Sequence, residues 1–230
     1  MTGLGPADTV AIVHAWFHDP VLVLCSFGAV AAFLGIARFM RSWSADTMRK
    51  WLHVTVGSWV LFITPRLDHL AWALVPPTLF IAINASRLLR RSFPDLASDP
   101  GAAKGLWTFP LGVALVYVCF WNEAGRTAIL AGVAALTFAD PAAALVGRRW
   151  GQRRYRGFGF GRSLEGSLAF LVVAAVAAGW VAGHAMPPQP VLHFAIGCGT
   201  AGALIEAFAP PGWDNLLLPV GIGATYCWLA

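Results

Sequence analysis

Charge is scarce in this chain of 230 residues: 12% of the residues are Asp, Glu, Lys or Arg, whereas 58% are hydrophobic and the mean hydropathy is +0.66. A water-soluble globular domain does not have this composition. About eight membrane spans of roughly 20 residues would use about 160 positions and leave room for short connections alone. The sequence therefore predicts one polytopic membrane domain and excludes a separate soluble domain.

Other features are also missing. Lys and Arg are absent from the first 20 residues, so the basic start of a cleavable signal peptide is lacking and we expect the N-terminus to be retained. The four cysteines show no close spacing of the C-x-x-C kind, which argues against a zinc site or a disulfide framework. No fixed-period repeat, coiled-coil heptad or low-complexity tract is present.

Apolar runs separated by Gly, Pro and charged residues predict an all-α fold, a bundle of about eight transmembrane helices. These runs lie at about residues 20–40, 50–65, 69–86, 106–122, 127–147, 167–184, 191–209 and 215–230. Pro76 and Pro77 are expected to interrupt the third run, so seven spans are the alternative. Residues 1–19 form a predicted extracytoplasmic N-terminal segment before the transmembrane domain of residues 20–230, and both this segment and residues 92–104 have the composition of loops.

The basic residues indicate the orientation of the chain. The net charge is +5 and the isoelectric point is near 9.4. If the N-terminus lies outside, fourteen of the sixteen Lys and Arg residues fall on the cytoplasmic side, and only Arg66 and Arg126 fall outside. This segregation is typical of an integral protein of the cell (inner) membrane. We therefore expect both termini to be extracytoplasmic and no nucleic-acid partner.

Four of the eleven acidic residues lie in or against apolar segments, where a charge is costly. They are Asp140, Glu165, Glu206 and Asp214. In the topology above, all four lie near the cytoplasmic face. Each one taken alone is equally well explained by pairing with a neighbouring arginine at the lipid headgroups, but four acids on one face favour a functional site.

The segment 137–167 combines an acid, glycines and arginines. Asp140 precedes Pro141, which disfavours helical backbone at Asp140 and predicts that the span ends there. The glycines let backbone N–H groups approach phosphate oxygens, and arginines bind the same anion with two N–H groups. The pattern predicts a metal and polyphosphate site on a cytoplasmic loop, although it matches neither the P-loop nor the dinucleotide-binding fingerprint. The alternative is a glycine-rich basic loop that contacts anionic lipid.

The spacing of this segment resembles the CTP-binding signature of the CTP-dependent lipid kinases, namely dolichol, polyprenol and phytol kinases and the CTP-using diacylglycerol kinase. This family is related to the phosphatidate cytidylyltransferases. The matching positions are Asp140-x-x-Ala143-x-x-x-Gly147-x-x-x-Gly151-x-x-Arg154 and Arg162-Ser163-x-Glu165-Gly166-Ser167, with Arg49-Lys50-x-x-His53, Glu206 and Asp214-Asn215 elsewhere. The resemblance extends from about residue 49 to the C-terminus. The family usually has lysine where Arg154 and Arg162 stand, which leaves open which phosphate each arginine contacts.

The resemblance implies phosphoryl transfer from CTP to a lipid alcohol with Mg²⁺ as cofactor. It implies that Asp140 and Asp214 bind the metal, that Glu165 holds a second metal or orients Arg162, and that Glu206 accepts the alcohol proton. The residues implied in CTP binding are Gly147, Gly151, Arg153, Arg154, Arg162, Ser163, Gly166 and Asn215. His53, and Asn84 and Arg87 at the end of the third run, are further candidates near the site, and the alternative is that a lone His or Asn near a helix end is hydrogen-bonded locally.

Three classes of function remain open at this point. The first is a membrane kinase that transfers the γ-phosphate of CTP to phytol, another isoprenoid alcohol or diacylglycerol, with membrane lipids around it. The second is a cytidylyltransferase that makes a CDP-lipid, and the third is a transporter. The short chain and the late Asp214-Asn215 pair resemble the kinase branch, and a transporter would place its acids nearer the bilayer midplane. The kinase is therefore the preferred hypothesis.

The orientation can be tested with single cysteines in a cysteine-free variant. Substitutions Ser44→Cys, Ser98→Cys and Gly157→Cys should react with an impermeant thiol reagent from the cytoplasmic side alone, because the basic segments are retained there. Thr2→Cys should react from the outside. Labelling of Gly157→Cys from the outside would reverse the topology.

Overall fold

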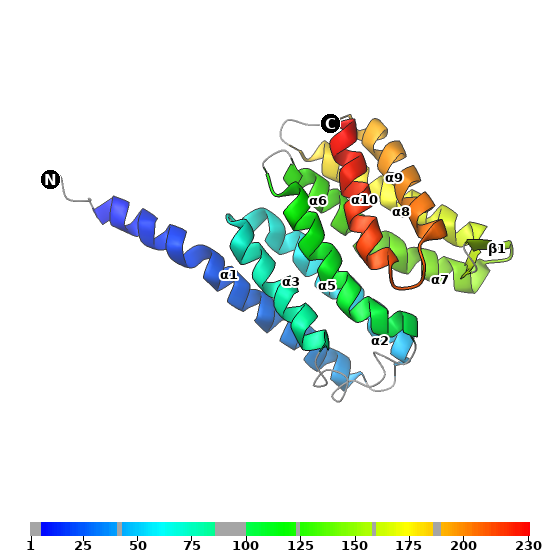
Figure 1. Ribbon diagram of the computed structural model, residues 1–230, viewed down its shortest axis with the longest axis horizontal. Helices are drawn as coiled ribbons and strands as arrows, with labels where there is room; N and C mark the ends of the chain where they lie inside the picture. Colours follow the sequence, from blue (N-terminus) through cyan, green and yellow to red (C-terminus); the bar gives the residue numbers. More distant parts are fainter. Residues whose placement is uncertain (1–5, 41–42, 86–99, 123–124, 158–159, 186–189) are drawn as a thin grey trace.

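The computed structural model describes residues 6–40, 43–85, 100–122, 125–157, 160–185 and 190–230. This part of the chain is a bundle of helices with one short β-hairpin, so the predicted all-α class is confirmed (Figure 1). The elements are α1 (Pro6–Phe39), α2 (Ala45–Ile63), the 3-10 turn η1 (Thr64–Arg66), α3 (Leu70–Ala85), α5 (Pro100–Phe120), α6 (Gly125–Ala134), the π-helical turn η3 (Ala135–Ala139), α7 (Asp140–Trp150), β1 (Arg154–Gly157), β2 (Phe160–Ser163), α8 (Leu164–Gly183), α9 (Val191–Phe208) and α10 (Asp214–Leu229).

Each of the eight predicted apolar runs coincides with a helix, and the fifth run corresponds to the continuous rod α6–η3–α7. Within the described residues, four helical segments are long and apolar enough to cross a membrane. They are Phe17–Phe39, Gly125–Trp150, Leu164–Gly183 and Val191–Phe208. Helices α3 and α5 contain shorter apolar stretches. The chain is an integral membrane protein, and the number of eight crossings stays a prediction.

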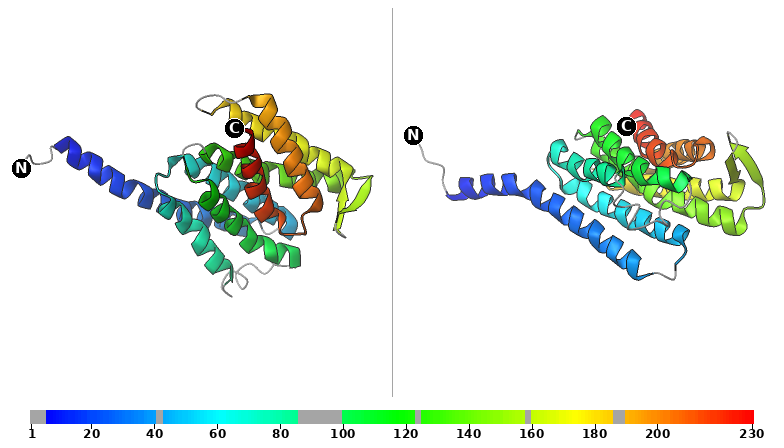
Figure 2. Two further views of the ribbon diagram at one scale, coloured as in Figure 1. Left: turned by 45° about the horizontal axis from the view of Figure 1, so that its top comes forward. Right: turned by 60° about the horizontal axis from the view of Figure 1, so that its bottom comes forward.

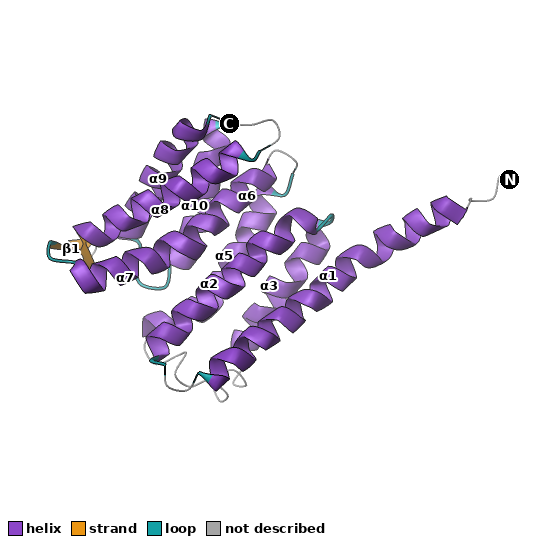
Figure 3. Ribbon diagram, turned by 180° about the vertical axis from the view of Figure 1, so that it is seen from behind, coloured by secondary structure: helices purple, strands orange, loops and turns teal. Residues whose placement is uncertain are grey.

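Two segments read as loops are partly helical. Helix α1 begins at Pro6, so the loop prediction for residues 1–19 is wrong from that position on. Proline is well suited to the first helical position because its missing N–H would have no partner there. The first turns of α1 extend beyond the other helices (Figures 1 and 3). Helix α5 likewise begins at Pro100, which corrects the end of the predicted loop 92–104, while residues 92–99 lie outside the described residues.

Helix α3 runs without interruption through Pro76 and Pro77, so the predicted break is wrong. Each proline removes one backbone hydrogen bond, but its fixed φ angle is compatible with a helix. Neighbouring groups compensate within a membrane bundle, where packed helices and hydroxyl side chains accept proline well. Here α3 packs against α1 and α5, and the Thr78 hydroxyl donates to the carbonyl of Leu74 at 2.7 Å.

The rod α6–η3–α7 also continues where an end was predicted. Asp140 has helical backbone angles (φ −63°, ψ −49°), so the expected departure from the helix at this residue is wrong. The turn before it widens to a π-helix instead, which accommodates the missing N–H of Pro141. The imidazole Nε2 of His53 in α2 donates to the carbonyl of Leu136 in this turn at 2.9 Å. A proline-induced irregularity thus fixes α2 against the rod.

The rod is packed among the other helices of the bundle (Figure 2), and it contributes residues to two apolar clusters. One cluster joins it to α8, α9 and α10 through buried residues such as Phe170, Phe194 and Leu218. The other joins it to α2, the turn after η1, α3 and α5 through residues such as Leu67 and Tyr117. We call the end of the bundle that carries β1 and β2 the hairpin end, and the opposite end, where α3 starts, the η1 end.

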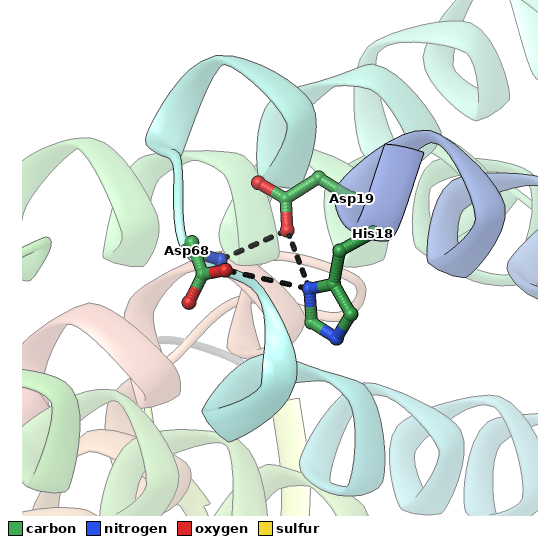
Figure 4. Close-up of side chains that lie close together, drawn as sticks. All are labelled: His18, Asp19 and Asp68. Atoms are coloured by element: carbon green, nitrogen blue, oxygen red, sulfur yellow. Dashed lines mark hydrogen bonds and ion pairs between the residues drawn. The ribbon is translucent and has the colours of Figure 1, made fainter. Parts of the chain in front are cut away.

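A polar cluster at the η1 end connects α1 to the turn before α3 (Figure 4). Asp19 is 1% exposed, and its carboxylate accepts the backbone N–H groups of Asp68 at 3.0 Å and His69 at 2.9 Å. The ring Nδ1 of His69 lies 2.8 Å from the same carboxylate, and the ring of His18 lies beside both acids. These buried hydrogen bonds hold the turn in place.

The contact between α2 and the π turn gives a test of the fold. A Cβ atom at Gly57 would overlap the side chain of the fully buried Thr137. We expect Gly57→Ala to lower the free energy of unfolding by about 1–3 kcal/mol, as overpacking does. Gly28→Ala in α1, where no atom lies within 4 Å of the added methyl group, is the matched control. Equal unfolding curves for both variants in mixed micelles would contradict this contact.

Candidate active site

Residues from four separate elements meet in one cavity at the hairpin end. Asp140 begins α7, Asp214 and Asn215 begin α10, Arg162 lies on β2, and Lys50 lies on the first turns of α2. All five line a cavity of about 660 Å³. The structure therefore brings together four of the residues that the sequence singled out for metal and CTP binding, although up to 75 positions separate them in the chain.

Arg162 connects two acids that are largely buried. Its Nη1 lies 3.1 Å from Oε1 of Glu206, and its Nη2 lies 3.5 Å from Oδ2 of Asp214. The side chain of Glu206 is 4% exposed and that of Asp214 is 14% exposed. Arg162 also donates to the carbonyl of Ala209 at 3.4 Å, and Ser167 donates to Glu206 at 3.0 Å. One guanidinium thus compensates two carboxylates and connects β2 to α9 and α10.

Asp140 lies in the same group without a direct donor. Among the described residues, no hydrogen bond or ion pair reaches its carboxylate. Asp214 and Glu206 are close enough to repel its negative charge, whereas Arg162 and Lys50 attract it. The alternative explanation for this acid, pairing with Arg148 or Arg149 at the headgroups, is not what the structure shows. The cavity therefore contains a carboxylate that is available to a cation.

The basic pair Arg49-Lys50 at the start of α2 was part of the family resemblance, but its ion pairs with Asp46 and the nearby Arg148 were not foreseen from the sequence. Asp46 binds Arg49 at 3.0 Å and Arg148 of α7 at 2.7 Å, and it also pairs with Lys50. Partial burial alone would raise the pKa of Asp46, but the hydrogen bond from Lys50 and the neighbouring positive charges outweigh it and lower the pKa below its ordinary value. The sequence signal that could have predicted these ion pairs is the spacing of Asp46, Arg49 and Lys50, because residues three and four positions apart lie on the same face of a helix.

Four of the predicted CTP-binding residues, Gly147, Gly151, Ser163 and Gly166, lie where α7 meets α8. A Cβ atom on Gly147 would lie 3.0 Å from the Ser163 hydroxyl, and one on Gly166 would lie 3.0 Å from the carbonyl of Ala143. A Cβ atom on Gly151 would lie 2.7 Å from the Ser163 hydroxyl. The Ser163 hydroxyl accepts the N–H of Gly166 at 3.1 Å and caps α8. Small residues therefore let the two helices approach closely, and a phosphate cradle at these positions stays a prediction.

The predicted loop 137–167 is wrong in form, because its first half belongs to the rod and its second half pairs as the hairpin β1–β2, with Arg154 opposite Ser163. Glu165 follows the hairpin and accepts the backbone N–H of Arg153 at 3.2 Å. The side chains of Arg153 and Arg154 are exposed. Glu165, Arg153 and Arg154 are not among the described residues that line the cavity. Their roles in binding CTP or metal therefore stay predictions.

His53 and Asn84 both line the cavity, and both also bind backbone carbonyls, so their contribution to the site stays a prediction. Because Nε2 of His53 donates to the carbonyl of Leu136, its Nδ1 is the hydrogen-bond acceptor of the neutral ring. The amide of Asn84 donates to the carbonyl of Leu106 and joins α3 to α5. Arg87 lies outside the described residues.

The rest of the cavity is apolar and was not foreseen from the sequence. It begins at the charged residues of the hairpin end and extends between α1, α2, α3 and α5 toward the η1 end. Phe27, Val56, Phe80 and Tyr117 are among the side chains on its wall. We call the charged end the mouth and the apolar part the body. A site with both parts can bind a molecule that is polar at one end and hydrophobic along its length.

Comparison with known proteins gives one informative similarity. No family model matches the chain, and no solved structure matches it. The chain is similar to the phytol kinase of Synechocystis sp. (strain PCC 6803), with 30% identity over 197 residues. The similar region covers 80% of this chain and 82% of that relative.

The position of Arg162 predicts a large effect on stability. Arg162→Ala would leave Glu206 buried without its partner, and we expect a loss of about 3–5 kcal/mol in the free energy of unfolding. Arg154→Ala, on the same hairpin but exposed, should change it by less than about 1 kcal/mol. Adding Glu206→Gln to Arg162→Ala should restore part of the loss, because the uncompensated charge is removed. No restoration would show that the ion pair does not carry the effect.

Proposed function

The chain belongs to the family of CTP-dependent lipid kinases, and from this premise we propose that it transfers the γ-phosphate of CTP to a lipid alcohol. The relative from Synechocystis is named for phytol, an isoprenoid alcohol. The observation that carries the proposal is the single cavity in which a charged mouth continues into an apolar body. The mouth suits a polyphosphate and the body suits a hydrocarbon chain.

The mouth has the charges that a nucleotide triphosphate requires. Arg49, Lys50 and Arg162 line it and can neutralise phosphate oxygens. Phosphoryl transfer depends mainly on positioning and on charge neutralisation, so such residues account for much of the expected catalysis. Arg162 is held by Glu206 and Asp214, which orients its guanidinium toward the cavity without a contribution from the substrate.

The acids of the mouth suit Mg²⁺. Hard divalent cations prefer carboxylate and amide oxygens, and Asp140, Asp214 and Asn215 offer these at the cavity wall. The carboxylate of Asp140 has no donor among the described residues, which is the observation that fits a cation here. Mg²⁺ held by Asp140 and Asp214 would supply positive charge to the phosphate oxygens. The backbone N–H groups near Gly147, Gly151 and Ser163 stay proposed contacts of the same phosphates.

In the transfer step, the alcohol oxygen forms a bond to the γ-phosphorus while the bond to the β,γ-bridging oxygen breaks, which yields a lipid phosphate and CDP. A residue must accept the alcohol proton. Glu206 was the prediction, but its carboxylate binds Arg162 and Ser167. His53 lines the cavity with Nδ1 as acceptor, so we assign the proton to His53 and a positioning role to Glu206.

The hairpin end is proposed to face the cytoplasm, where CTP is made. The basic cluster at the start of α2 and the arginines of the hairpin lie at this end. This arrangement agrees with the positive-inside distribution of the sequence. An alcohol dissolved in the bilayer would then meet CTP at the mouth.

The proposal is tested with CTP labelled at either phosphate. Label from the γ-phosphate on the lipid indicates a kinase, label from the α-phosphate indicates a cytidylyltransferase, and no label on any lipid contradicts both. Asp140→Asn should lower the rate of γ-phosphate transfer by at least about a hundredfold, because it removes the charge of a metal ligand at constant volume.

The matched control is Asp68→Asn, the same chemical change on an exposed residue at the η1 end. It should keep the rate of the unmodified protein. Activity of Asp140→Asn equal to that of Asp68→Asn at limiting Mg²⁺ would overturn the assignment of Asp140.

A further inference from the structure

The apolar body of the cavity is closed at the η1 end by a layer of buried side chains. The layer consists of Ile63, Leu67, Ala73, Val113 and Tyr117, from α2, the turn after η1, α3 and α5. Each of these residues is at most 5% exposed. We call these five residues the floor. The hydrocarbon chain of a substrate that enters from the mouth would meet the floor at the far end of the cavity.

The floor is held by hydrogen bonds in an apolar environment. The hydroxyl groups of Tyr117 and Thr64 lie 2.7 Å apart and share a hydrogen bond. Behind the floor, Arg126 donates to the carbonyl of Leu67 at 2.8 Å, and the carboxylate of Asp19 holds the next backbone N–H groups (Figure 4). A hydrocarbon chain that displaced the floor would leave buried polar groups without hydrogen-bond partners, and each such group would cost a free energy of about 1–3 kcal/mol. The floor is therefore expected to resist displacement.

The distance from mouth to floor corresponds to a chain of definite length. On α2, the cavity wall extends from Arg49 to Ile63, which spans about 21 Å at 1.5 Å per residue. With carbon–carbon bonds of about 1.5 Å, an extended chain advances about 1.25 Å per carbon, so at most about 17 carbons fit in that distance, because the phosphates near Arg49 would occupy its outer part. An acyclic alcohol of four isoprene units has about 16 carbons in its main chain.

We propose that the floor sets the maximum length of the acceptor, so that the cavity takes a single acyclic chain of up to about 16 main-chain carbons. Polyprenols of many isoprene units are too long for the body. Diacylglycerols carry two chains, whereas a volume of about 660 Å³ is typical of a pocket for one small ligand. This inference rests on the proposed function and selects among the acceptors that the family resemblance left open.

The first test compares acyclic isoprenoid alcohols of two to ten isoprene units as acceptors, at one mole fraction in mixed micelles and with γ-labelled CTP. The kcat/KM should rise up to four units and fall by about tenfold or more at six units. Dipalmitoylglycerol should be a poor acceptor. Equal kcat/KM for four and ten units would overturn the proposal, because the chain would then leave the cavity sideways into the bilayer.

The second test shortens the cavity. Val113→Phe adds a ring to the floor, and it should shift the ratio of kcat/KM for two-unit against four-unit alcohols by about tenfold in favour of the shorter one. Val118→Phe is the matched control, because this residue of the same helix is 57% exposed and does not line the cavity. Ala73→Leu, at another floor position, gives the same test if Val113→Phe does not fold. An unchanged ratio in a folded floor variant would contradict the proposal.

A binding measurement separates this inference from the proposed function. Thermal unfolding of the full chain in detergent, without CTP, is followed with each alcohol as the added ligand. Stabilisation that increases up to four units and then declines supports the floor even if no alcohol receives phosphate, in which case only the kinase proposal fails. Phosphate transfer that does not depend on chain length leaves the kinase proposal intact and overturns the floor.

Discussion

Arg162 is the residue on which the hairpin end depends. Two carboxylates, those of Glu206 and Asp214, lie beside it in a part of the protein with little water, where an uncompensated charge would be costly. Because Arg162 lies on β2, the hairpin is needed to bring it there, and the hairpin is in turn connected to the start of α8. The geometry of the mouth therefore follows from the need to pair buried charges.

The second constraint is the π turn before Pro141. It keeps the rod continuous while it turns Asp140 toward the mouth, and it frees the carbonyl of Leu136 for His53. The same contact that satisfies this carbonyl leaves Nδ1 as the acceptor of the neutral His53 ring, and His53 lines the cavity. A local backbone irregularity thus positions two residues of the cavity wall, Asp140 as the proposed metal ligand and His53 as the proposed proton acceptor.

The two ends of the cavity have different physical origins. At the mouth, charged groups from α2, β2 and α10 gather because they neutralise one another and can neutralise a polyphosphate. At the floor, apolar side chains from α2, α3 and α5 pack closely, and the polar cluster around Asp19 stabilises the turn behind them. A lipid kinase needs both ends, since its two substrates differ in polarity and must meet at one point.

The sequence by itself determined the membrane class, the helix ranges and the family, because composition, apolar runs and the spacing after Asp140 are local properties of the chain. It also identified the acids Glu206 and Asp214, since acids in apolar segments are costly. Local rules failed where packing overrides them, as in the helical backbone of Asp140 and the unbroken helix through Pro76. Only the tertiary structure decided that Arg162 pairs with Glu206 and that the apolar cavity ends at the floor. Such pairings and shapes depend on how distant helices pack, which neighbouring residues in the chain do not encode.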